Sequence, residues 1–178
     1  VIGILLAVLL WWNETVARVL EPYLVVLNSL PKTALAPVFI VWLGNNMKTI
    51  IVAAVSVAVF STTITLYNTF QEMDPGKIKM IRTLGGQKKD ILCKLILPGN
   101  VPAIISAMKV DIGLTLVGVI IGEFVAAKAG LGYLIIYGSQ VFKLDYVLLS
   151  IVILCLISTG LYLLISLLEK LCLKHYSV

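Results

Sequence analysis

Three ionisable residues lie within one long apolar segment, residues 101–125, and could act on a solute there: Lys109, Asp111 and Glu123. A charged side chain near the centre of a lipid bilayer costs about 2.5 to 3.5 kcal/mol on the insertion scale, and such residues often mark the path of an ion or a solute. Counted from Pro102 at about 1.5 Å per residue, Lys109 lies roughly 10 Å deep, Asp111 slightly deeper and Glu123 near the far surface. We predict that these residues line a solute path.

Each of the three residues also has a structural interpretation. Lys109 and Asp111 are two residues apart, so they face different sides of a helix and need separate partners. In this interpretation Lys109 extends its ammonium group to the membrane surface, as long basic side chains do. Asp111 receives hydrogen bonds from Ser, Thr or backbone groups of a neighbouring span. Glu123 forms a structural hydrogen bond, and the alternative is that it orients the loop after it or contacts a partner at the outer mouth.

Motifs for catalysis, metal binding and cofactor binding are missing from the sequence. It contains no HExxH, no paired intramembrane aspartates and no GxxxxGK[ST] phosphate-binding loop. The three cysteines, Cys93, Cys155 and Cys172, show neither CxxC nor Cys/His ligand spacing, so they indicate neither a disulfide nor a metal site. His175 is a lone histidine without ligand-like neighbours. We therefore expect no catalytic residue, no metal and no cofactor.

The elements that position the charged residues are membrane spans. Apolar residues make up 60% and charged residues 13% of the chain, whereas charged residues make up about 25% of a soluble domain. The formal net charge of +5 does not indicate a nucleic-acid partner, because the basic residues gather in one segment without interleaved aromatic residues. The composition predicts an all-α membrane protein, a polytopic helical bundle forming a single transmembrane domain over residues 1–178.

A span needs about 20 mostly apolar residues, and the sequence predicts about five spans. The three long spans are residues 48–67, 101–125 and 146–168. The two short ones are residues 1–12 (the end of a span, or one continuing toward Leu20) and 34–43 (or a longer span extended backwards through Pro31 and Pro37). Val1 begins inside an apolar run, without an initiating Met or a basic region before it. We therefore expect that the N-terminus is truncated and that a further span precedes it.

The basic residues predict how the spans are oriented, because Lys and Arg are retained on the cytoplasmic side. Six of the fourteen lie in the segment 72–98, between two of the long apolar stretches. With this segment in the cytoplasm, alternation of the spans gives two groups: Arg18, Lys32, Lys170 and Lys174 inside, and Lys48, Lys128 and Lys143 outside. The prediction is a multi-pass plasma-membrane protein with a cytoplasmic C-terminus.

The basic segment 72–98 predicts a rigid helical knob. Pro75 suits the first turn of a helix, and apolar residues then recur at a spacing of three: Ile78, Ile81 and Leu84. Gly85 and Gly86 interrupt this helix, and a second amphipathic helix follows until Pro98 stops it. Such a knob suits a groove on a partner protein. The alternative is a basic amphipathic helix that lies on anionic lipid.

The sequence RTLGGQKKDILCKLILP, residues 82–98, resembles the cytoplasmic loop of permease subunits of binding-protein-dependent ABC importers. The pattern of that loop is Glu-Ala-Ala, three residues, Gly, nine residues, Ile, one residue, Leu-Pro. Gly85 takes the place of the glycine, Leu95 that of the isoleucine, and Leu97-Pro98 form the closing pair. The chain departs from the pattern where Glu-Ala-Ala is expected, with Lys79-Met80-Ile81, and so lacks an acidic residue that would pair with an ATPase.

Three other stretches are similar to the nitrate, sulfonate and taurine branch of these permeases: LPKTALAPVFIVWLG (30–44), GEFVAAKAGLGYLI (122–135) and LDYVLLSIVIL (144–154). The resemblance implies the type I ABC importer permease (MetI-like) fold, with six spans in the complete chain, in a bacterial plasma membrane. The residues it assigns to ATPase coupling lie in the segment 72–98: Lys79, Met80, Ile81, Arg82, Gly85, Gly86, Lys88, Lys89, Leu97 and Pro98.

The partners that the resemblance implies are an ABC ATP-binding subunit, a second permease subunit, with a homodimer preferred to a heterodimer, and an extracytoplasmic substrate-binding protein. The glycine-rich segment 128–144 predicts a short helix at the outer face, where the binding protein would dock. Membrane lipid surrounds the spans, and ATP hydrolysis resides on the separate subunit.

The implied function is the transmembrane subunit of an ATP-driven importer for a small polar, anionic solute, such as nitrate, a sulfonate, taurine or a vitamin precursor. Lys109 is the residue that favours an anion. The alternative is a stand-alone ion channel or secondary carrier. Such a protein needs no ATPase and leaves the basic knob unexplained.

Overall fold

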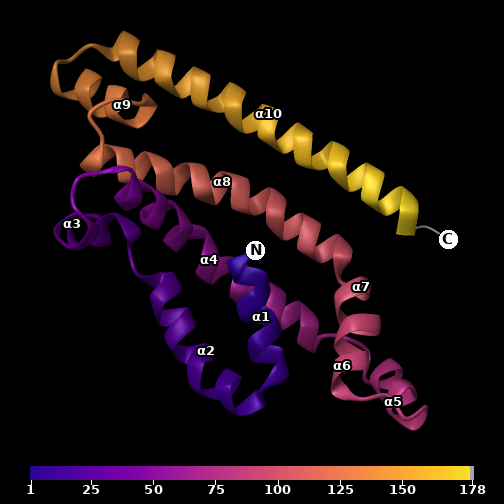
Figure 1. Cartoon of the computed structure of the whole chain (residues 1–178). Coiled ribbons are helices and arrows are strands. Elements are labelled where there is room, and N and C mark those ends of the chain that lie inside the picture. Colours follow the sequence, from indigo (N-terminus) through magenta and orange to yellow (C-terminus); the bar gives the residue numbers. More distant parts are fainter. Residues whose placement is uncertain (177–178) are drawn as a thin grey trace.

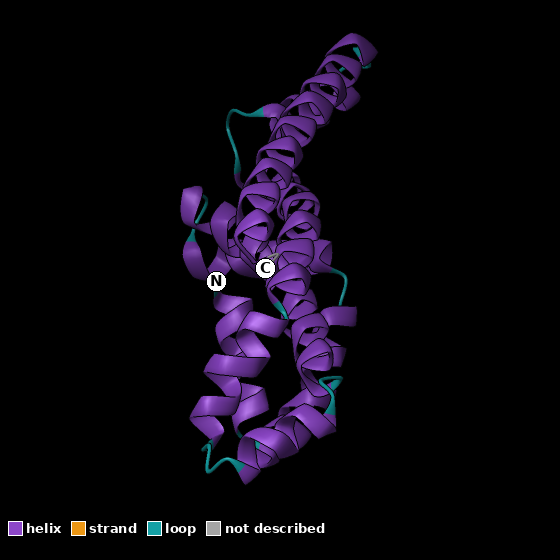
Figure 2. Ribbon diagram, turned by 90° about the vertical axis from the view of Figure 1, so that its right-hand side faces the viewer, coloured by secondary structure: helices purple, strands orange, loops and turns teal. Residues whose placement is uncertain are grey.

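The computed structural model describes the backbone of residues 1–176 and the side chains of residues 1–167, 169 and 170. Predictions for the side chains of Cys172, Lys174 and His175 fall outside these residues. Every regular element in the described part is a helix, and short connections join them (Figures 1 and 2). The elements are α1 (Ile2–Trp12), α2 (Glu14–Ser29), α3 (Lys32–Leu43), α4 (Met47–Gln71), α5 (Pro75–Thr83), α6 (Lys88–Ile91), the π-helix η1 (Leu92–Ile96), α7 (Leu97–Gly99), α8 (Val101–Ala126), α9 (Leu131–Gln140) and α10 (Leu144–Tyr176).

Three of the described helices are long and apolar enough to cross a membrane: α4, α8 and the part of α10 from Leu144 to Leu167. The pair α2 and α3 passes the same test as one span, although the two helices are bent by 97° at their junction. The two short predicted spans form shorter helices, α1 with 11 residues and α3 with 12. Residues 1–12 do not continue toward Leu20, because the side chain of Asn13 caps a new helix by accepting hydrogen bonds from the amides of Thr15 and Val16.

Helices α4 and α8 form the centre of the bundle, with α1, α2 and α3 packed against α4 and with α9 and α10 beside α8 (Figure 1). Two glycines one turn apart on α8 allow the close approach of α4. A Cβ at Gly118 would lie 2.5 Å from the Cα of Ala54, and a Cβ at Gly122 would lie 2.8 Å from the Cα of Ile50. Small residues with this spacing are typical of helix pairs in membranes, where close packing drives association.

The bundle has two distinct ends (Figure 1). Helices α5, α6 and α7 lie at one end, and α3 and α9 lie at the other. The basic segment and the loops around Lys128 and Lys143 are therefore separated by the length of the spans, as alternation of the spans predicts.

Lys32 is an exception to the predicted distribution of charge. It was expected among the cytoplasmic residues, but its ammonium nitrogen lies 5.6 Å from the ring centre of Phe60, in the middle of α4. It donates hydrogen bonds to three carbonyl oxygens at the end of α2, those of Leu27 (2.6 Å), Asn28 (2.8 Å) and Leu30 (3.2 Å). The bend after α2 leaves these carbonyls without helical partners, and the lysine charge favours the negative end of the helix dipole.

Candidate functional site

The first half of the basic segment forms a short capped helix, as predicted from Pro75. Pro75 is the first residue of α5, and the side chain of Asp74 accepts a hydrogen bond of 2.8 Å from the amide of Gly76. The helix ends at Thr83, and Gly85 has a φ of +82°, which favours glycine. At Gly86 a Cβ would lie 2.9 Å from the carbonyl oxygen of Ile81. The two glycines therefore have different roles, one in backbone conformation and one in close packing.

The second half of the segment is helical through Pro98, so the prediction that Pro98 stops the helix is wrong. Helix α6 continues into the π-helix η1 and then into α7, which ends at Gly99. Proline has no amide proton to donate within a helix, and a π-helical turn just before it changes the hydrogen-bond pattern locally. The side chain of Asn100, where this helix ends, donates a buried hydrogen bond of 2.8 Å to the carbonyl of Ile96.

An ion pair on the outside of the knob joins Asp90 to Lys94, with an N–O distance of 2.7 Å. Asp90 also accepts a hydrogen bond of 2.9 Å from the amide of Gln87, at the start of α6. The hydrogen bond from Lys94 lowers the pKa of the Asp90 carboxyl below its usual value, and the same contact raises the pKa of Lys94. Both groups are therefore charged at neutral pH, and their ion pair stabilises the first turns of the second helix.

An apolar cluster fixes the knob to the ends of the spans. The buried side chains of Leu10, Phe70, Ile91 and Ile96 come from α1, α4, α6 and η1, and they form a single cluster. Ile78 and Ile81 of the predicted stripe pack against this cluster. Leu84 does not, because α5 ends at Thr83, and it is 80% exposed.

Most of the residues that the sequence assigns to ATPase coupling are exposed on the knob, although Arg82 and Lys88 lie on its inner side, toward the ends of the spans. Lys79, Met80, Arg82, Gly85, Lys88 and Lys89 are exposed, whereas Ile81 and Gly86 are half-buried inside the corner. Leu97 and Pro98 are half-buried at the junction with α8 and so lie apart from the outer face. The result is a basic surface with two exposed apolar side chains, Met80 and Leu84, one helical turn apart.

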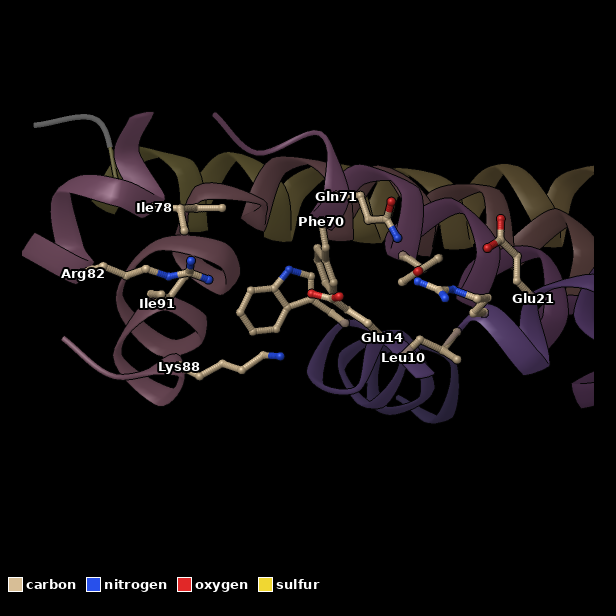
Figure 3. Close-up of a pocket in the computed structure, with 12 residues that line it drawn as sticks. Leu10, Glu14, Glu21, Phe70, Gln71, Ile78, Arg82, Lys88 and Ile91 are labelled. Atoms are coloured by element: carbon tan, nitrogen blue, oxygen red, sulfur yellow. The ribbon is translucent and has the colours of Figure 1, made fainter. Parts of the chain in front are cut away.

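A hollow of about 460 Å³ lies between the knob and the ends of α1, α2 and α4. Figure 3 shows Arg82 and Lys88 of the knob and Glu14 of α2 directed toward it. The Lys88 ammonium lies 5.6 Å from the ring centre of Trp11, a cation–π distance. Glu14 and Glu21 were not singled out from the sequence, and their spacing around Arg18 on one helix face is the signal that would have found them.

The intramembrane lysine that the sequence singled out has an acidic partner. Lys109 of α8 forms an ion pair with Glu169 of α10, and both side chains are about four fifths buried. Its ammonium also lies 5.6 Å from the ring centre of Tyr162. Glu169 was missed from the sequence because it lies 60 residues away, so no local spacing relates the two residues.

The two intramembrane acids make the hydrogen bonds that the structural interpretation predicts. Asp111 accepts a hydrogen bond of 2.5 Å from the hydroxyl of Thr62 on α4. Glu123 accepts one of 2.6 Å from the amide of Gly132, in the first turn of α9. A carboxylate at a helix N-terminus is favoured by the exposed amides and the helix dipole, so Glu123 orients the loop that follows α8.

Comparison with known proteins identifies the family. Residues 1–173 match the model of the binding-protein-dependent transport system inner membrane component. The chain belongs to this family. Its members are permease subunits of ABC importers, with the MetI-like fold, and are not themselves enzymes. The family and the apolar helices make the chain a multi-pass inner-membrane protein.

Three relatives show the range of proteins to which this permease-family chain is similar. It is 31% identical to a formylaminopyrimidine transport permease of Halalkalibacterium halodurans, over 75% of the chain and 53% of the relative. It is 27% identical to a protein named as an aliphatic sulfonates transport permease of Escherichia coli, over 92% of the chain and 61% of the relative. It is also 27% identical to a riboflavin transport system permease of Chloroflexus aurantiacus, over 90% of the chain and 59% of the relative. The chain thus spans between half and two thirds of the length of these relatives.

Proposed function

We propose that this chain forms a transmembrane subunit of an ATP-driven importer and that its knob, residues 72–98, couples the spans to a separate ATP-binding subunit. The observation that carries the proposal is the construction of the knob. Its inner face is fixed in the apolar cluster with α1 and α4, and its outer face leaves Met80 60% and Leu84 80% exposed among basic residues. Exposed apolar side chains rimmed by polar ones mark protein interaction sites.

The connections of the knob would allow it to act as a lever on α4 and α8. Movement of the knob by a partner would be transmitted to α4 and α8, because α5 follows α4 and α7 precedes α8 with short connections. The knob would lie in the cytoplasm, as would the C-terminus. The single transmembrane domain 1–178 would work with a second permease subunit and with an extracytoplasmic binding protein docked near α9.

The solute is proposed to be small and polar. The relatives' names include formylaminopyrimidine, aliphatic sulfonates and riboflavin, so they do not favour one charge. Lys109, the residue that favoured an anion, has its charge balanced by Glu169. The anionic part of the prediction therefore loses its support from the residues.

Co-purification of the full-length permease tests the proposal. We expect it to bring down a protein with a phosphate-binding loop, and Met80→Glu combined with Leu84→Glu to reduce the bound ATPase by at least about tenfold, since hot-spot losses exceed 2 kcal/mol. Phe142→Glu is the matched control, because Phe142 is 91% exposed near α9 and α10, at the opposite end. If no ATPase is bound, the coupling proposal is wrong and a stand-alone channel or carrier is favoured. If the double variant binds the ATPase normally, the exposed face with Met80 and Leu84 is not the coupling surface.

A further inference from the structure

Two hollows meet at Asp111, in the middle third of α8. One has a volume of about 290 Å³ and lies between α4 and α8, and the other, of about 270 Å³, lies between these helices and the start of α1. Both are lined by Asp111 and Thr62. Their other polar lining residues are hydroxyl side chains: Ser61, Thr65, Thr69 and Ser106 in the first, and Thr115 in the second.

These hydroxyls form a polar face on an otherwise apolar helix pair. Thr65 and Ser106 are exposed, although both lie on helices that are long and apolar enough to cross a membrane. A hydroxyl group can both donate and accept a hydrogen bond, so such a face can replace part of the water around a polar solute.

Asp111 has little internal compensation for its charge. The hydroxyl of Thr62 lies 2.5 Å from Asp111 and 2.8 Å from the carbonyl oxygen of Ala58. A hydroxyl has one proton and a carboxylate has about four acceptor positions, so this contact leaves most of the acceptor capacity of Asp111 free. An uncompensated carboxylate within a span is costly, which makes a functional role the default interpretation.

Three other charged residues of the described helices have close polar partners. Lys109 pairs with Glu169, Glu123 accepts from the amide of Gly132, and Lys32 donates to three carbonyls. Among the residues that line the two hollows, the charged one is Asp111.

We infer that the hydroxyl-lined face of α4 and α8 is a wall of the solute path and that Asp111 makes this path favour solutes that present a cationic or hydrogen-bond-donating group. This inference rests on the proposed function and names the solute class for it. A bare anion is disfavoured, whereas a protonated amine, or a neutral heterocycle with N–H donors, is accepted by the free carboxylate positions.

Charged thiol reagents test this inference without knowledge of the solute. Thr65→Cys and Ser106→Cys are made separately in the full-length permease, with Cys93, Cys155 and Cys172 replaced by Ser, and are labelled in membrane vesicles. The reagents are the 2-(trimethylammonium)ethyl and the 2-sulfonatoethyl methanethiosulfonates, with each rate normalised to that of a free thiol in solution. Leu156→Cys is the control for an exposed apolar surface away from the two hollows, because Leu156 is 68% exposed on α10.

Ser106 is five residues from Asp111, about 8 Å along the helix axis. At that distance in a half-hydrated hollow, one negative charge raises the local concentration of a monovalent cation roughly fivefold and lowers that of a monovalent anion roughly fivefold. We therefore expect the cationic reagent to react roughly twentyfold faster than the anionic one at residue 106, with the preference lost in Asp111→Asn and kept in Asp111→Glu. Leu156→Cys should react with neither reagent.

Each outcome decides a part of the inference. If Thr65→Cys and Ser106→Cys are as unreactive as Leu156→Cys, the face is not a solute path. If they react equally fast with the cationic and the anionic reagent, Asp111 does not select solutes by charge. This result comes from the protein that retains Asp111, so it can be obtained even if Asp111→Asn fails to accumulate in the membrane. ATPase co-purification from the same vesicles separates an importer whose path lies elsewhere from a chain that couples to no ATPase.

Discussion

The packing of α8 against α4 predicts that two chemically identical substitutions on one helix will have opposite effects. Gly118 is buried, and a Cβ there would lie 2.5 Å from the Cα of Ala54 and 3.1 Å from the carbonyl oxygens of Ala53 and Ala54. Gly113 is exposed, and a Cβ there would meet no atom within 4 Å. Gly118→Ala must push two backbones apart, whereas Gly113→Ala fills open space.

The magnitude follows from two opposing terms. Gly→Ala gains about 1 kcal/mol of helix propensity at either position. Overpacking against a backbone costs about 1–3 kcal/mol, toward the upper end where no flexible side chain can move away. Gly113→Ala is therefore expected to be neutral or to stabilise by up to about 1 kcal/mol, and Gly118→Ala to destabilise by up to about 2 kcal/mol.

Thermal unfolding of the full-length permease in detergent measures the difference. With a shift of about 2–4 °C per kcal/mol for a protein of this size, Gly118→Ala should unfold several degrees below Gly113→Ala. Gly118→Ser should lower the midpoint at least as much, because it adds the same Cβ. Equal midpoints for Gly113→Ala and Gly118→Ala would refute the close contact between α8 and α4.

Three further substitutions concern charged groups inside the bundle. Glu123→Gln should raise amide exchange at Gly132 by roughly tenfold, because the loss of a charged acceptor costs about 1.5 kcal/mol; unchanged exchange would contradict the role of Glu123 at the start of α9. Lys109→Met should destabilise more than Lys109→Met combined with Glu169→Met, by about 1–3 kcal/mol in thermal unfolding, because the single change leaves a buried charge unpaired; additive effects would argue against the pair. Lys32→Met should lower the unfolding midpoint more than Lys32→Arg does, because only arginine can still donate to the carbonyls at the end of α2; equal losses would show that the charge is not needed there.

Local patterns in the sequence predicted the local structure of the knob and of the segment 128–144 well. Pro75 begins α5, the diglycine turns the chain, and the segment 128–144 contains the short helix α9. These features depend on residues within a few positions of each other, whose backbone preferences are strong. The end of the second helix was placed wrongly at Pro98, because a π-helical turn can precede a proline without ending the helix.

The predicted spans show where apolar composition is insufficient. Residues 1–12 and 34–43 are apolar enough to suggest membrane spans, but Asn13 and Pro31 begin new helices, α2 and α3, and the bend between these two reaches 97°. Hydropathy averages over a window and does not register a cap or a bend. Lys32 was assigned to the cytoplasmic side by counting spans, and its partners were not foreseen because they are carbonyls left free where α2 ends.

The functional meaning of the intramembrane charges depends on partners that no local pattern reveals. In the sequence, Lys109, Asp111 and Glu123 were each a charged residue in one apolar segment, with Glu123 nearer the far surface. The structure separates them by what lies opposite: a full counter-charge from α10 for Lys109, a backbone amide for Glu123, and one shared hydroxyl proton for Asp111. Lys109 and Glu123 thus have structural partners, and Asp111, with one shared hydroxyl proton, borders two hollows that also contain hydroxyl side chains. In the solute path that we infer, the charge that a solute meets is that of Asp111, which has the opposite sign to the charge of Lys109.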